Sequence, residues 1–107
     1  MRISLILVRL GLACFATSAL AQSASPSLGE QIAKTSCIAC HEIAPNIPAK
    51  DLQSGAPSFV DVANMPSTTE LSIKVFLRSS HRSMPNFILS PEEIDSIAAY
   101  IVSLKKK

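Results

Sequence analysis

Five consecutive residues, Cys37-Ile38-Ala39-Cys40-His41, constrain this chain more than any other feature of its sequence. Two thiols stand close together, and an imidazole follows the second thiol directly. The pattern Cys-x-x-Cys-His is typical of c-type haem attachment, in which both thiols add to the haem vinyl groups as thioethers. The histidine is then placed to bind the iron from one face. The motif therefore predicts one covalently bound haem c on Cys37, Cys40 and His41.

Two other kinds of site use a similar pair of cysteines. A redox-active disulfide of the thioredoxin type needs a βαβ unit, and no parallel-strand pattern surrounds Cys37 and Cys40. A zinc ion needs four ligands, and only His81 remains as a fourth, while the adjacent Cys40 and His41 would strain a tetrahedral site. A chance match is disfavoured because the whole chain has only 3 cysteines. The sequence favours haem over these alternatives.

The N-terminal residues 1–21 have the features of a secretory signal peptide. Arg2 and Arg9 supply positive charge, an apolar stretch follows, and Ala19-Leu20-Ala21 offers a small-x-small cleavage site. The apolar stretch is shorter than the roughly 20 residues that a membrane-spanning helix needs. We therefore expect residues 1–21 to be cleaved and residues 22–107 to form one domain in the periplasm, without stable membrane insertion.

Charge and size narrow the function of this domain. The formal charge of +2 includes two arginines of the predicted signal peptide, so the mature domain is close to neutral. A near-neutral domain gives no reason to expect a nucleic-acid partner. A domain this small has a marginal core from its side chains alone, and a covalently held, mostly apolar haem would supply much of what is missing.

Apolar spacing and capping signals predict an all-α domain. A first helix is expected over residues 27–40 and a short one over residues 59–63. The next is expected from Ser67, because Ser67 and Glu70 have the spacing of a capping box, and it should run to about Ser79. The last is expected from Ser90, where a second capping box precedes an apolar stripe at helical spacing: Ile94, Ile97, Ala98, Ile101 and Leu104.

The order of these features resembles a class I monohaem cytochrome c over essentially the whole mature chain. The resemblance implies the small cytochrome c fold, three to four helices wrapped around one covalently attached haem. It also implies that Met84, in Ser83-Met84-Pro85, binds the iron opposite His41. A thioether is a soft ligand, which favours ferrous iron and raises the reduction potential. Met65 also precedes a proline and His81 lies close to Met84, so both remain alternatives.

The family also orients the proximal imidazole through a proline carbonyl downstream of the haem motif. Gly55-Ala56-Pro57 resembles that element, so the resemblance implies this role for Pro57 as part of the cofactor site. The spacing from His41 is longer than in compact members of the family. Pro45 and Pro48 therefore remain open.

The family packs its first and last helices closely, and the resemblance places Gly29 at that contact with Tyr100 as its neighbour. Ala33 departs from the family, which commonly has an aromatic residue at this position. For Tyr100 and Phe87 we expect plain packing in the core.

With both axial positions filled by protein, the iron has no open site for a substrate. We therefore expect an electron carrier and no enzyme, with redox proteins as partners: a dehydrogenase or respiratory-chain donor, and an oxidase or other acceptor. The leading alternative is a dedicated cytochrome subunit of a periplasmic dehydrogenase or oxidoreductase complex. A second alternative is a haem sensor or catalyst in which the bond to Met84 is labile.

Overall fold

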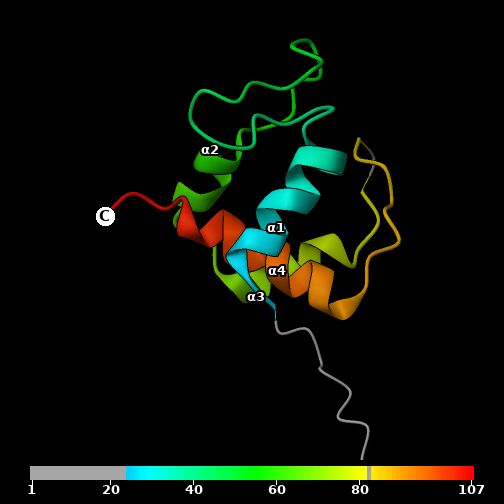
Figure 1. Ribbon diagram of the computed structural model, residues 1–107, viewed down its shortest axis with the longest axis vertical. Helices are drawn as coiled ribbons and strands as arrows, with labels where there is room; N and C mark the ends of the chain where they lie inside the picture. The colour runs from blue at the N-terminus through cyan, green and yellow to red at the C-terminus, as the bar shows by residue number, and fades with distance from the viewer. Residues whose placement is uncertain (1–23, 82) are drawn as a thin grey trace, which may run out of the picture.

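The computed structural model describes residues 24–81 and 83–107, and every regular element in these ranges is helical (Figure 1). Their only strand-like pairing is an isolated bridge between Ala44 and Ile47. None of these helices is long and apolar enough to cross a membrane. The predicted signal peptide, residues 1–21, lies outside the described residues. The elements are α1 (Pro26–Ile32), η1 (Ala33–Cys37), α2 (Phe59–Asn64), α3 (Glu70–Leu77) and α4 (Pro91–Ser103).

The haem motif follows directly on the first helical segment. Ser25 caps α1, with its hydroxyl accepting the N–H of Leu28, and Pro26 takes the first helical position, where it has no N–H to satisfy. From Ala33 onward the hydrogen bonds widen to the π-helical pattern, and the N–H of Ile38 reaches the carbonyl of Ala33 at 2.9 Å. The predicted helix over residues 27–40 is therefore wrong in its second half, which is a π segment followed by a turn. Such segments are frequent at functional sites.

A close crossing of α1 with α4 forms the centre of the domain (Figure 1). Gly29 is buried there, and a Cβ at this position would lie 2.6 Å from the backbone carbon of Ser96 and 2.7 Å from Cβ of Tyr100. The N–H of Ser25 donates to the Ser96 hydroxyl at 3.1 Å, which satisfies this fully buried side chain. Ala33, which follows α1 directly, is also fully buried and belongs to the same hydrophobic core as Tyr100. The predicted helix contact at Gly29 and Tyr100 is present.

The helix α3 packs against α4, and the ion pair between Lys74 and Asp95, at 3.1 Å, joins the two helices. The helix α3 begins at Glu70, later than predicted. Its capping box is made by Thr69 and Ser72, and the predicted pairing of Ser67 with Glu70 is wrong. The N–H of Thr68 instead closes a turn on the carbonyl of Met65 at 3.0 Å, so residues 66–68 precede the helix.

The capping box of α4 at Ser90 and Glu93 is as predicted.

Candidate functional site

The two thiols of the haem motif lie at the end of η1 and in the turn that follows it. Cys37 and Cys40 are both half-buried and both free thiols. Burial raises the pKa of the Cys37 thiol to about 11, because removal from water disfavours the thiolate. This thiol is therefore protonated at neutral pH, and it resists the thiolate reactions that would join it to another cysteine.

The imidazole of His41 is held from one side by the chain downstream. Its Nδ1 donates a hydrogen bond to the carbonyl of Pro57 at 2.7 Å. Since Nδ1 carries the proton in this contact, Nε2 is left with its lone pair for a metal ion. Phe59 adds an aromatic wall, with its ring centroid 5.3 Å from that of His41 and the rings inclined at 50°. Of the three prolines considered from the sequence, Pro57 is the one whose carbonyl meets this ring.

Tyr100 extends this proximal wall from α4. Its ring lies edge-on to Phe59, with centroids 6.4 Å apart. Its hydroxyl donates to the carbonyl of Ile43 at 2.8 Å, across a separation of 57 residues in the sequence. Ile43 is fully buried, and it lies two residues after His41. Tyr100 is therefore more than the core packing predicted for it, because it anchors the segment that follows His41 to the last helix.

We expect replacement of Tyr100 by phenylalanine to lower the free energy of unfolding by about 1–3 kcal/mol, because the buried Ile43 carbonyl loses its donor. Thermal unfolding of the wild-type and variant proteins measures this difference. Ser103→Ala removes a hydroxyl–carbonyl bond at an exposed position of the same helix and serves as the control. An equal and small loss in both variants would contradict an anchoring role for Tyr100.

Burial also raises the pKa of Tyr100, which makes the anchor dependent on pH. The folded protein holds the phenol proton more tightly than the unfolded chain does. The contribution to stability is therefore complete below the ordinary tyrosine pKa of about 10 and falls as the pH rises through the raised value. Tyr100→Phe should lose stability less steeply above pH 10 than the wild type. The chain has 1 tyrosine, so an absorbance titration reports on this group alone.

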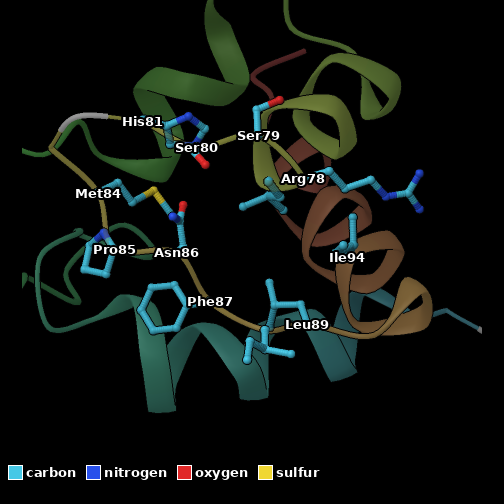
Figure 2. A pocket seen from close by; sticks show the side chains of 12 residues that line it. Arg78, Ser79, Ser80, His81, Met84, Pro85, Asn86, Phe87, Leu89 and Ile94 are labelled. Atoms are coloured by element: carbon cyan, nitrogen blue, oxygen red, sulfur yellow. The ribbon is translucent and has the colours of Figure 1, made fainter.

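Met84 lines a hollow of about 260 Å³ between α3, residues 79–81 and 84–89, and the start of α4 (Figure 2). Figure 2 shows the Met84 side chain extending from the loop toward the interior of the hollow, on the same side as Pro85 and Phe87. Leu89 and Ile94 face them from the other side. The lining is mixed: Leu77, Pro85, Phe87, Ile88, Leu89 and Ile94 are apolar, while Arg78, Ser79, Ser80, His81 and Asn86 are polar. The thioether of Met84 lies on the side of Pro85 and Phe87.

The two rival distal ligands are placed differently. Met65 ends α2 as its C-cap and does not line the hollow. His81 does line it, but its imidazole is stacked on Phe76, with ring centroids 3.6 Å apart and the planes inclined at 21°. Phe87 is 41% exposed, so the prediction that it packs in the core is wrong. It faces the hollow beside Met84 instead (Figure 2).

These residues fit a c-type haem. The loop that carries His41 and Pro57 and the loop that carries Met84 lie on either side of the C-terminal end of η1, where Cys37 stands (Figure 1). Two free thiols, an imidazole with one nitrogen available and a thioether form the donor set that this cofactor requires. Exposed or half-exposed apolar side chains such as Phe87 are the surface that a large apolar ring would cover.

Comparison with known proteins agrees with this geometry. Residues 24–101 match the family described as cytochrome c oxidase, cbb3-type, subunit III. The chain belongs to this family of small c-type cytochromes. Cytochrome c-552 of Bradyrhizobium diazoefficiens is 36% identical over 94 residues, which is 88% of each chain. No solved structure matches the chain. Electron transfer is the general function of c-type cytochromes and haem c is their cofactor, and the helical fold of this cytochrome is the small one that the sequence predicts.

The structure also brings a segment to the site that the sequence motifs did not indicate. Residues 50–54 fold back onto the haem motif and bond to it through Lys50, Asp51 and Ser54. The signal for this segment was the long spacing between His41 and Pro57. That spacing indicates extra residues but not where they dock, since the bonds involve backbone carbonyls that carry no sequence signature.

Proposed function

We propose that this cytochrome carries single electrons in the periplasm on one haem c, attached to Cys37 and Cys40 and ligated by His41 and Met84. Residues 1–21 act as a cleaved signal peptide in this proposal, and residues 22–107 are the working domain. The haem would supply the one-electron couple of ferric and ferrous iron. The residues of the chain hold the cofactor, set its preference for one oxidation state and keep water from most of its surface.

The observation that carries this proposal is the state of His41. Its Nδ1 is engaged by the Pro57 carbonyl at 2.7 Å, directly after two free thiols, so the other ring nitrogen is held in a fixed orientation for a metal. The hydrogen bond also raises the basicity of the imidazole as a ligand. Pro57 is thus a positioning residue for the cofactor rather than a ligand of it.

Met84 is favoured as the ligand opposite His41 because its thioether extends into this hollow beside the apolar side chains of Pro85 and Phe87. A soft thioether in such surroundings favours ferrous iron, which suits a carrier working at high potential. With His41 and Met84 both bound, no coordination site remains for a substrate, and this supports a carrier over an enzyme. Arg78 lies at the same hollow and is exposed, which gives local charge where a redox partner would approach.

The attachment chemistry is tested by replacing both cysteines. Protein exported by a host with haem-ligation machinery should be red and keep its haem under denaturing electrophoresis. Cys37→Ala combined with Cys40→Ala should abolish the haem stain, because no thioether can form. Mass spectrometry of the purified wild type should give the mature chain from residue 22 plus one haem. A colourless, zinc-loaded wild-type product from such a host would overturn the proposal.

A second function is favoured by the family match, whose description names a subunit of an oxidase. In this reading the chain is a dedicated cytochrome subunit of a larger periplasmic oxidoreductase and is rarely free. Gentle isolation of the native protein distinguishes the two functions. A free carrier should elute as a small soluble haem protein, while a subunit should elute with a stoichiometric partner.

A further inference from the structure

Residues 50–54, which we call the strap, bond to the backbone of the haem motif at three successive carbonyls. The N–H of Lys50 donates to the carbonyl of Ile38 at 2.8 Å, and the N–H of Asp51 donates to that of Ala39 at 3.0 Å. The hydroxyl of Ser54 donates to the carbonyl of Cys40 at 2.6 Å. Every carbonyl between the first cysteine of the motif and its histidine is therefore held by the strap.

These carbonyls need partners from outside their own helix. The last carbonyls of a helical segment have no intrahelical donor and must find one in water, in a side chain or in another segment. Here the carbonyl of Cys37 is satisfied within the motif, by the N–H groups of Cys40 and His41. The strap supplies a donor to each of the next three carbonyls, those of residues 38–40. It therefore fixes the backbone of the turn that carries both thiols and the imidazole.

Ser54 makes the last of the three bonds between the strap and the haem motif. Its hydroxyl donates to the Cys40 carbonyl and accepts the N–H of Ala56 at 3.3 Å. The carboxylate of Asp51 accepts the N–H of Gln53 at 2.9 Å, which shapes the turn leading to Ser54. Gly55 follows with φ of +67°, a conformation in which other residues are strained. The chain then turns toward Pro57, which reaches the same histidine from the other side.

We propose that Ser54 is a positioning residue for the proximal ligand, acting through the strap on the turn from Cys37 to His41. This proposal rests on the proposed haem site. The longer spacing between His41 and Pro57 then has a role, because the extra residues hold the turn that would carry the haem. The hydroxyl fixes the backbone directly before His41, while Pro57 fixes the ring of His41. Together they would set the orientation of the imidazole toward a bound haem.

The test compares the oxidised haem-loaded wild type with Ser54→Ala. Haem methyl resonances in the paramagnetic NMR spectrum report the orientation of the imidazole plane, and they should shift in Ser54→Ala. The amides of Lys50 and Asp51 should exchange with solvent about fivefold faster, as expected for the loss of one hydrogen bond that closes the strap. Ser54→Thr keeps the hydroxyl and should restore both readouts. Asp51→Ala, which loosens the same turn by another bond, should move both in the direction of Ser54→Ala.

Ser103→Ala is the matched control, since it removes a hydroxyl that also donates to a backbone carbonyl, at the C-terminal end of α4. It should leave the haem methyl resonances and the strap amides unchanged. If Ser54→Ala and Asp51→Ala leave the resonances at their wild-type positions, Ser54 does not position the ligand and the proposal fails. A wild type that carries no covalent haem would instead overturn the function from which this proposal starts, so the two failures are distinct.

Discussion

Replacing Gly29 by alanine is expected to destabilise this cytochrome by about 3 kcal/mol, the upper range for overpacking a core. The new Cβ would overlap the Ser96 carbonyl group and lie 2.7 Å from Cβ of Tyr100. Two of the three nearest atoms belong to the backbone of α4, so no rotamer change relieves the contact and the helices must move apart. For a domain of this size, the midpoint of thermal unfolding should fall by roughly 12–24 °C.

The sign of the change in stability on Gly29→Ala distinguishes crowding at the crossing from helix propensity. Helix propensity alone predicts that alanine stabilises an interior helical position by about 1 kcal/mol relative to glycine. Crowding at the crossing predicts the opposite sign at Gly29. Gly55→Ala is a useful control, since its Cβ would meet nothing within 4 Å, and only its positive φ carries a cost, of about 1–2 kcal/mol. A stabilised Gly29→Ala protein would show that α1 and α4 are less closely packed than described.

Replacing Met84 by alanine is expected to change the electronic properties of the haem most strongly. A sulfur–iron bond to low-spin ferric haem gives a weak charge-transfer band in the far red. We expect the oxidised wild type to show this band and Met84→Ala to lose it. The reduction potential should fall, by about 59 mV for each tenfold loss of preference for ferrous iron. The vacated position should let the reduced variant bind carbon monoxide.

Two matched variants make this result specific to Met84. Met65→Ala alters the C-cap of α2 and His81→Ala removes a ring that is stacked on Phe76, and both should keep the band. If Met65→Ala or His81→Ala is the variant that loses the band, the ligand assignment is wrong while the carrier function stands. If the wild type shows no band and binds carbon monoxide readily at neutral pH, the protein is a sensor or catalyst.

The regular parts of the fold could be predicted from the sequence where a single cap was available. Ser90 and Pro91 leave one place for α4 to begin, and the structure has it there. Before α3 three hydroxyl residues follow one another, and any of them could cap the helix. Thr69 is the N-cap in the structure because the preceding residues form a turn that is closed by the hydrogen bond from Thr68 to Met65. The π pattern of η1 was not predictable, since it differs from an α-helix only in which carbonyl each N–H meets.

In the candidate site, too, the sequence indicates some residues and gives no sign of others. Cys37, Cys40 and His41 are side chains with distinctive chemistry, so their spacing alone predicts a haem motif, whereas Met84 was implied only by the resemblance to a family and had Met65 and His81 as alternatives. The contribution of Ser54 could not be read in this way, because serine is common in loops and its partner is a backbone carbonyl. The stack of His81 on Phe76 likewise depends on how the loop after α3 folds back, which no local pattern states.

The crossing of α1 and α4 also sets the order in which the domain can assemble. It joins Gly29 to Ser96, near the two ends of the described chain, and synthesis begins at the N-terminus. The closest contact of the core must therefore wait until the last helix has been made, and a long loop has to close before it forms. During that interval Cys37 lacks the burial that raises its pKa in the finished fold. The Cys37 thiol is thus more reactive before the domain closes than after it.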